Sequence, residues 1–264
     1  MKDLKNKIVW ITGASSGIGK EMAIQLAHEG ARIILTARSE DKLQELKAQL
    51  SGEEHWIYPM DLLQVDAIPR GVEEVLQMVG KVDVLVNNAG ISQRSLAKDT
   101  SIEVDRKIME LDHFAVVAMT KSLLPQFIDR KSGMIINVSS VAGKVGVPMR
   151  TAYCAAKHAV MGFMDALRAE ITAYNIEVMN VTPGFVQTNI SVNAVIGNGE
   201  THGKMDPLIA SGVPVDVCVR KIVRGMKRGT PELLIAQGKS KLAPYLRRFF
   251  PKVLFRMMAN IAAQ

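Results

Sequence analysis

Short apolar, β-prone runs alternate with helical segments along most of this chain. The predicted strands cover residues 7–11, 32–37, 56–58, 82–86, 134–138, 177–181 and 231–236. The predicted helices run from the glycine turn after residue 12 to about residue 29 and over 41–50, 65–79, 101–127, 155–172 and 216–228. Parallel strands need crossover helices that cover both faces of the sheet. The pattern therefore predicts an α/β fold: a single domain with a doubly wound parallel sheet of about seven strands and helices on both faces. Its ligands are expected at the carboxyl ends of the strands.

Length and composition fit one soluble domain. The 264 residues are enough for a large core, and we predict that the domain covers residues 1–238 and a helical tail covers 239–264. The N-terminus is polar, and no apolar run approaches the ~20 residues of a membrane span. Cys154 and Cys218 have neither a disulfide pattern nor metal-ligand spacing, so a cytoplasmic location and no metal site are expected. Cys154 could be a nucleophile, but a small buried role is preferred because no base is placed beside it.

The positive charge is concentrated at the C-terminus. After Leu233 there is no acidic residue, whereas the six cations there are Lys239, Lys241, Arg247, Arg248, Lys252 and Arg256. Of 33 basic residues, 27 remain for the body against 26 acidic ones, so the body is nearly neutral (33 − 6 = 27). With no basic groove or stacking motif in the body, no nucleic-acid partner is expected.

A glycine-rich turn joins the first strand to the first helix. It reads Thr12-Gly13-Ala14-Ser15-Ser16-Gly17-Ile18-Gly19, with glycines spaced G-x-x-x-G-x-G. Such glycines let the backbone approach a pyrophosphate, and the helix N-terminus favours the anion. The turn predicts a Rossmann-type dinucleotide site; the alternative is a tight turn without a ligand.

Other strand ends carry polar residues suited to the same ligand. The second strand ends at Arg38, with no acid before Glu40, which favours the 2′-phosphate of NADP(H) over NAD(H); the alternative is a solvated arginine. Asp61 follows the third strand and either contacts the adenine or caps the next helix. Asn87-Asn88-Ala89-Gly90 follows the fourth strand, where Asn side chains connect neighbouring strands or bind ligand.

A serine, a tyrosine and a lysine follow the fifth strand. Ser140 stands at its end, and Tyr153 and Lys157 lie four residues apart, on one helix face. A free phenol has a pKa near ~10, and a cation one turn away lowers it. A serine hydroxyl would hold the oxygen that gains or loses the proton. By itself, Tyr-x-x-x-Lys is also an ordinary amphipathic spacing.

These motifs together resemble the short-chain dehydrogenase/reductase family over roughly residues 5–236. The loop and tail look more like its subgroup of dehydrogenase/reductase member 7B-type and 11β-hydroxysteroid dehydrogenase-like proteins. The resemblance implies that Tyr153 is the general acid or base, that Lys157 lowers its pKa and holds the nicotinamide ribose, and that Ser140, rather than Ser139, binds the substrate oxygen. The implied cofactor contacts are Gly13, Ser15, Ser16, Gly17, Ile18, Gly19, Arg38, Asp61, Leu62, Asn88, Ala89, Gly90, Tyr153, Lys157, Pro183, Gly184, Val186 and Thr188.

One position departs from the family pattern. Asp112 stands where the family usually has an asparagine that helps hold a water in the proton path. An ionised aspartate accepts hydrogen bonds but donates none, and its charge would favour the Lys157 cation. An altered proton relay is expected, with activity retained. His113 could join the relay, but a structural role is preferred.

Two segments near the C-terminus concern substrate and membrane. Residues 187–214 are rich in Gly and Pro and are predicted to form a substrate lid. In the tail, apolar residues spaced three and four apart predict one helical stripe with a break at Pro251; they are Leu242, Tyr245, Leu246, Phe249, Phe250, Val253, Leu254, Met257, Met258 and Ile261. A basic amphipathic helix suits a membrane interface. Packing against the body or a partner subunit is the alternative.

The function expected from these features is hydride transfer between NADP(H) and a ketone, aldehyde or alcohol, with a lipophilic substrate indicated by the lid and tail. The alternatives are a nucleotide-binding regulatory protein that has lost the chemistry and an epimerase or dehydratase of nucleotide sugars. The chain is short for the latter. A homodimer or homotetramer is expected from the resemblance, with contacts through the helices near 101–127 and 153–172.

Overall fold

A single parallel sheet organises the chain. The computed structural model describes residues 3–262. Within them, seven strands pair in the order β3-β2-β1-β4-β5-β6-β7, and every pairing is parallel. The strands are β1 (Ile8–Thr12), β2 (Arg32–Thr36), β3 (Trp56–Ile57), β4 (Val84–Asn87), β5 (Gly133–Val138), β6 (Ile176–Pro183) and β7 (Glu232–Ile235). The predicted doubly wound α/β fold is confirmed.

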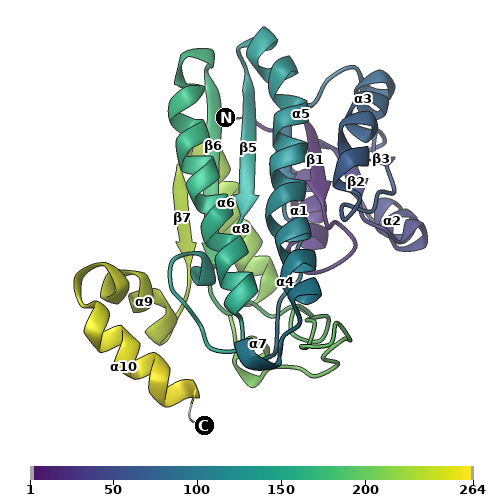
Figure 1. Cartoon of the computed structure of the whole chain (residues 1–264). Coiled ribbons are helices and arrows are strands. Elements are labelled where there is room, and N and C mark those ends of the chain that lie inside the picture. The colour runs from purple at the N-terminus through teal and green to yellow at the C-terminus, as the bar shows by residue number, and fades with distance from the viewer. Residues whose placement is uncertain (1–2, 263–264) are drawn as a thin grey trace.

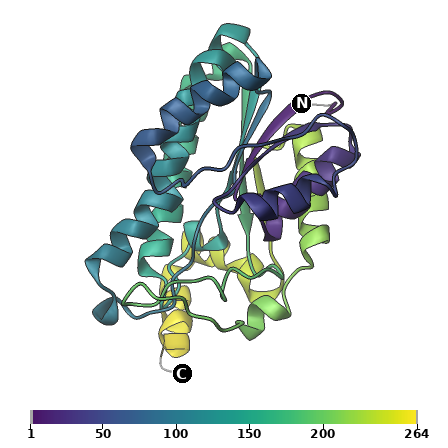
Figure 2. The ribbon, with the colours of Figure 1, turned by 90° about the vertical axis from the view of Figure 1, so that its right-hand side faces the viewer.

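Helices cover both faces of the sheet (Figures 1 and 2). The α-helices are α1 (Gly17–His28), α2 (Glu40–Lys47), α3 (Ile68–Val79), α4 (Ile102–Met109), α5 (Ala115–Arg130), α6 (Thr151–Glu170), α7 (Pro207–Ala210), α8 (Val215–Arg228), α9 (Gly238–Phe249) and α10 (Pro251–Ala262). Short 3-10 turns cover η1 (Val65–Ala67), η2 (Ala97–Asp99), η4 (Val141–Gly143) and η5 (Thr172–Tyr174), and η3 (Glu110–Phe114) is a π-helical turn. Helices α3, α5 and α6 pack on one face, and α1 and α8 on the other.

Strand β1 shows how the sequence builds two cores. All five of its residues are buried, because successive side chains point to opposite faces and both faces are covered by helices. Val9 and Ile11 pack with α1 and α8, whereas Ile8 and Trp10 pack with α3, α5 and α6. The continuous apolar run of this strand is therefore a consequence of burial on two sides.

The observed elements differ from the predicted ones in three places that affect the site. Helix α6 begins at Thr151 rather than 155, so Tyr153 and Lys157 both lie within it. The long helix predicted over 101–127 is interrupted by the π turn η3. Asp61 does not cap a helix, because Gln64 precedes η1 and the Asp61 carboxylate accepts from the Leu63 amide at 3.1 Å. That cap alternative was wrong; contact with adenine remains a prediction.

The predicted lid is ordered by backbone bonds to the body. The Val195 amide donates to Ser92 O at 2.9 Å, and the Arg94 amide donates to Val195 O at 2.8 Å. Val213 bridges to Val186 at the other end of the segment. Residues 187–214 therefore cross the carboxyl ends of the strands, with the short helix α7 at their far end (Figures 1 and 2).

The tail forms two helices that meet at Pro251, where a break was predicted. The prediction of a single apolar stripe was wrong, because Phe250 leaves the helical conformation (φ −135°, ψ 55°) and α10 restarts in a new direction. Leu254 is buried, and Leu246, Met257 and Met258 are half-buried. The exposed members are Leu242, Tyr245, Phe249, Phe250 and Val253. The side chain of Ile261 lies outside the described residues.

Among the residues that the structure describes, no helix is both long enough and apolar enough to cross a membrane.

Candidate functional site

A large cleft of about 1800 Å³ runs along the carboxyl ends of the strands. Its walls include the glycine turn after β1, the polar ends of β4 and β5, the first turns of α6, the lid and the tail. All the predicted site residues line this cleft except Gly19. The structure thus brings together groups predicted from widely separated stretches of sequence, while the chemical role of each remains a prediction.

Tyr153 and Lys157 face the cleft from one side of α6. The Nζ atom of Lys157 lies 5.7 Å from the centroid of the Tyr153 ring, and it donates to the carbonyl oxygen of Val138 at 3.4 Å. The Tyr153 side chain is half-buried, and its hydroxyl has no hydrogen-bond partner within residues 3–262. That hydroxyl is available to a ligand oxygen, with a fixed cation beside its ring.

Asp112 forms a buried ion pair with Lys157. Oδ2 of Asp112 lies 3.1 Å from Nζ of Lys157, and Oδ1 accepts from the Ile91 amide at 2.8 Å. Burial is the largest single influence and disfavours the Lys157 ammonium, but the charge and hydrogen bond of Asp112 together with the charge of the Tyr153 phenolate outweigh it, so the pKa of Lys157 is raised. Complete burial raises the pKa of Asp112, opposed by Lys157 and by the Ile91 amide. The short contact and both donors favour the ionised pair. The expected effect of Asp112 on the cation is therefore present.

The two serines after β5 have different surroundings. Ser139 is buried, and its Oγ donates to the Lys157 carbonyl oxygen at 3.2 Å. Ser140 is half-buried; its Oγ accepts from the Ala142 amide at 3.1 Å and makes a long 3.4 Å contact with Pro183 O. Ser140 is the less buried of the two hydroxyls, and its contact with a substrate oxygen remains a prediction.

The glycine turn needs its glycines for close packing as well as for backbone shape. Gly13 and Gly17 have φ of +65° and +56°, a conformation that favours glycine. A Cβ on Gly19 would lie 2.4 Å from the Gly13 carbonyl oxygen. This buried position explains why Gly19 packs the turn together rather than facing the cleft. The prediction that it contacts cofactor directly is therefore not supported by its placement.

Asn88 holds the turn in place. Its Nδ2 donates to the carbonyl oxygens of Thr12 and Gly13 at 2.9 and 3.2 Å. Thr12 Oγ1 in turn accepts from the amides of Asn88 and Ala89 at 3.0 and 3.1 Å. Of the two roles left open for this asparagine, the connection between strand ends is observed. Sequence reasoning did not predict the role of Thr12, although this residue precedes the first glycine.

The residues present fit a phosphorylated dinucleotide. Thr188 of the lid lies close to the glycine turn, since its Cγ2 would lie 3.3 Å from a Cβ on Gly17, and both residues line the cleft. Arg38 is exposed at the cleft and forms no ion pair within the described residues. An unpaired guanidinium at the end of β2 suits a 2′-phosphate, and Asp61 and Leu62 line the same end of the cleft.

Neither His113 nor the cysteines add chemistry to the site. His113 does not line the cleft; burial lowers its pKa, and its ring packs edge-on against Phe114. Cys154 is buried, accepts from the Val147 amide at 3.3 Å and has a pKa raised by burial, while burial raises the pKa of Cys218 to about 12. Thiols with raised pKa values are poor nucleophiles. The structural roles preferred for these residues fit their surroundings.

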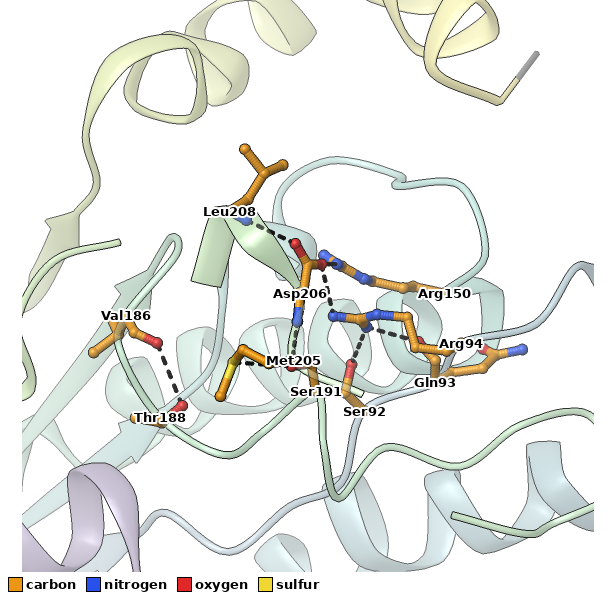
Figure 3. Close-up of polar contacts among 10 residues, drawn as sticks. All are labelled: Ser92, Gln93, Arg94, Arg150, Val186, Thr188, Ser191, Met205, Asp206 and Leu208. Atoms are coloured by element: carbon orange, nitrogen blue, oxygen red, sulfur yellow. Dashed lines mark hydrogen bonds and ion pairs between the residues drawn. The ribbon is translucent and has the colours of Figure 1, made fainter. Parts of the chain in front are cut away.

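The sequence missed a charged cluster on the substrate side. Arg94 and Arg150 meet Asp206, a residue of the lid, at the cleft wall (Figure 3). The only local signal was Asp206 before Pro207, a pattern typical of a helix start, and the Asp206 side chain does cap α7. The sequence also did not predict that the tail forms part of the cleft wall. The tail residues that line the cleft include Ala243, Leu246, Leu254, Met257 and Met258.

The chain is similar to known proteins over nearly its whole length. A family model described as short chain dehydrogenase matches residues 7–197. "Dehydrogenase/reductase SDR family member 7B" of Mus musculus is 39% identical over 265 residues, covering 98% of this chain and 82% of the relative, in agreement with the predicted 7B-type subgroup.

Solved structures share the fold. A short-chain dehydrogenase from Streptomyces avermitilis superposes with a TM-score of 0.82 at 26% identity, covering 98% of this chain and 97% of that one. A short-chain dehydrogenase from Sphingobium yanoikuyae, solved in complex with NADPH, gives a TM-score of 0.78 at 25% identity and covers 96% and 95%. With its glycine turn and its Ser140, Tyr153 and Lys157 in one cleft, the chain belongs to the short-chain dehydrogenase/reductase family and is an oxidoreductase that acts on CH–OH groups.

Proposed function

We propose that this protein interconverts a lipophilic ketone or aldehyde and its alcohol with NADP(H), with Tyr153 as the proton donor or acceptor. The observation that carries the proposal is the presence of Ser140, Tyr153 and Lys157 in the cleft that also contains the glycine turn. A nucleotide-binding protein without activity is the alternative. The free Tyr153 hydroxyl and the intact cation beside it favour the enzyme.

In the reductive direction, the bound nicotinamide supplies a hydride to the carbonyl carbon. Ser140 donates a hydrogen bond to the carbonyl oxygen and holds it near Tyr153. The Tyr153 hydroxyl gives its proton to that oxygen, and the Lys157 ammonium stabilises the phenolate that remains. Asp112 keeps Lys157 protonated and fixes its position. In oxidation the same groups act in reverse, and the phenolate accepts the alcohol proton.

Arg38 supports a preference for NADP(H). Its guanidinium is exposed at the cofactor end of the cleft, where no acidic side chain follows β2 before Glu40. The similar structure from Sphingobium yanoikuyae was solved with NADPH. A forked contact from Arg38 to the 2′-phosphate would exclude neither cofactor but favours the phosphorylated one.

The tail supports a lipophilic substrate and contact with a membrane. One side of α9 and α10 lines the cleft with apolar side chains, and the other exposes Phe249 and Phe250 beside Arg248 and Lys252. Exposed aromatic rings next to cations suit the boundary of an anionic bilayer. We place the protein in the cytoplasm with peripheral membrane contact through the tail. Phe114, exposed between α4 and α5, supports a homodimer or homotetramer through these helices.

Deuterium transfer tests the reaction. Methyl ketones of increasing chain length would be incubated with NADPH deuterated at the transferring C4 position. The expected result is deuterium on the carbinol carbon and a kcat/KM that rises with chain length. Consumption of NADPH no faster than with a Tyr153→Phe variant, across all the ketones, would contradict the enzymatic proposal.

A further inference from the structure

Two arginines share one carboxylate at the substrate side of the cleft. Oδ2 of Asp206 lies 3.1 Å from Nη2 of Arg94 and 3.0 Å from Nη2 of Arg150 (Figure 3). The other oxygen of Asp206 accepts from the Leu208 amide at 2.9 Å. Both oxygens of the Asp206 carboxylate therefore have hydrogen-bond partners, and its single negative charge lies beside two positively charged guanidinium groups.

The cluster is held rigidly. Nη1 of Arg94 donates to Ser92 Oγ at 3.0 Å and to Gln93 O at 2.8 Å. The Asp206 amide donates to Ser191 Oγ at 3.0 Å, which fixes the carboxylate from the lid side. Both Arg94 and Asp206 thus have several partners that set their orientation. Arg150 differs, because its contact with Asp206 is its only side-chain hydrogen bond or ion pair within residues 3–262.

The excess positive charge is not balanced nearby in the cleft wall. Among the described residues, the acidic ones that line the cleft are Asp61, Asp112 and Asp206. Asp112 is paired with Lys157, and Asp61 lies with Arg38 at the cofactor end. Lys107 adds a further cation to the lining. The substrate side therefore carries net positive charge within partly buried walls, where an unbalanced charge is costly and an anion is bound more strongly than in water.

Arg150 also stands close to the reacting groups. It precedes Tyr153 by three residues, immediately before α6, and its side chain is 15% exposed at the cleft. Nε and Nη1 of Arg150 donate to no atom of the described residues, so their hydrogens are free for a ligand. Leu246, Leu254 and Met258 of the tail contribute apolar side chains to the lining of the same cleft. The cleft thus offers a forked donor and an apolar surface to one ligand.

We propose that Arg150, supported by Arg94, forms an anion-binding subsite for the substrate, so that the carbonyl compound carries a carboxylate or phosphate group as well as an apolar part. That the bound anion is a substrate rests on the proposed function, whereas the existence of an anion-binding site does not. Asp206 orients the two guanidinium groups and leaves them one net positive charge to neutralise. If the cluster only held the lid in place, its disruption would weaken the binding of neutral and anionic ligands equally.

Binding of simple probes tests the subsite without relying on turnover. Octanoate, octyl phosphate and octan-1-ol would be titrated into the protein by calorimetry, below their aggregation concentrations and with saturating NADPH. We expect the anionic probes to bind about tenfold more tightly than the alcohol, as charge-assisted hydrogen bonds allow. Comparison of octanoate with octyl phosphate then shows which anion is preferred.

Matched variants locate the effect. Arg150→Met keeps most of the side-chain volume and should remove the advantage of the anions while leaving octan-1-ol binding unchanged. Asp206→Asn removes the negative charge and should leave that advantage intact or increase it. Arg70→Ala changes an exposed arginine that is paired with Glu74 outside the cleft, so it controls for a general loss of positive charge and should leave the binding of all three probes unchanged.

Equal binding of all three probes to the wild-type protein would overturn the subsite. So would an equal weakening of all three probes by Arg150→Met and by Asp206→Asn, because that result would show that the cluster only holds the lid in place. If NADPH itself does not bind, the proposed function fails. The same titrations without NADPH, in an Arg38→Ala variant that lacks the guanidinium at the cofactor end, would still test the subsite.

Discussion

The Nζ atom of Lys157 lies 3.1 Å from Oδ2 of Asp112, and both side chains are buried. This contact connects α6 to the π turn η3 and, through the Ile91 amide, to the loop after β4. The lysine that the proposed mechanism requires as a cation is thus held by a full negative charge rather than by a neutral amide. Replacement of Asp112 should therefore affect both activity and stability.

Replacing Asp112 with asparagine should change the pH dependence of activity. The variant keeps an oxygen for the Ile91 amide but loses the charge that raises the pKa of Lys157. We expect the alkaline limb of the kcat/KM profile to move to lower pH, because Lys157 loses its proton sooner. Steady-state kinetics against pH would measure this. Superimposable profiles would show that the charge has no role in the proton path.

The same pair makes a prediction about stability. The folded pKa of Lys157 is raised above its ordinary value of 10.5, so its contribution is fully present below that pH and is lost as the pH rises through the folded value. At pH 7, Asp112→Asn should lower the free energy of unfolding by up to about 3 kcal/mol. Urea titrations from pH 7 to 11 should show wild type losing more stability than the variant above pH ~10.5. Parallel losses would contradict the assignment.

Tyr153→Phe should remove turnover but retain cofactor binding. Without the hydroxyl no proton is delivered, and we expect kcat to fall by about 10²- to 10⁴-fold. The dissociation constant for NADPH, measured by fluorescence, should change little. Tyr174→Phe is the matched control, because Tyr174 lies in η5 outside the cleft and should keep full activity. An active Tyr153→Phe protein would require a different proton donor.

Arg38→Ala should alter cofactor choice. Loss of a charge-assisted contact should weaken NADPH binding by roughly 10- to 100-fold and leave NADH binding unchanged. Arg70→Ala is the control, since Arg70 is an exposed arginine paired with Glu74 outside the cleft. Fluorescence titrations with both cofactors would measure the difference. A loss that is equal for NADPH and NADH would remove Arg38 from contact with the 2′-phosphate.

Two glycine substitutions should have opposite effects on stability. Gly19→Ala places a Cβ 2.4 Å from the Gly13 carbonyl oxygen, so we expect a loss of about 1–3 kcal/mol from forced backbone movement. Gly162 lies in α6, where an added Cβ would meet no atom within 4 Å, so Gly162→Ala should stabilise the protein by about 0.5–1 kcal/mol. Urea unfolding of both variants measures the effects. A tolerated Gly19→Ala would show that the turn can relax.

The tail should bind anionic vesicles. Flotation of the protein with liposomes should recover it in the lipid fraction, whereas Phe249→Ser with Phe250→Ser should remain in the dense fraction. Both rings are exposed, so this change should not affect folding, and thermal melting provides the check. Wild-type protein that fails to float would rule out membrane contact through this face.

The sequence predicted what is local and periodic. The strands and the glycine turn follow from runs of a few residues, and the motifs at the strand ends converge because parallel strands end at one edge. The charged cluster did not follow from the sequence, because Arg94 and Asp206 are 112 residues apart and meet only when the lid packs against the loop after β4. The two-sided tail was missed because the apolar spacing continues through Pro251, although the helix axis changes there.

The π turn that carries Asp112 contains one residue more than the same stretch of α-helix would need. Removing one residue from 110–114 would let α4 and α5 join as one regular helix, with the faces of both still directed as they are now. The fold would keep its packing while the carboxylate opposite Lys157 lost its position. We therefore expect deletion of a single codon here to remove the ion pair with Lys157 while the protein still folds.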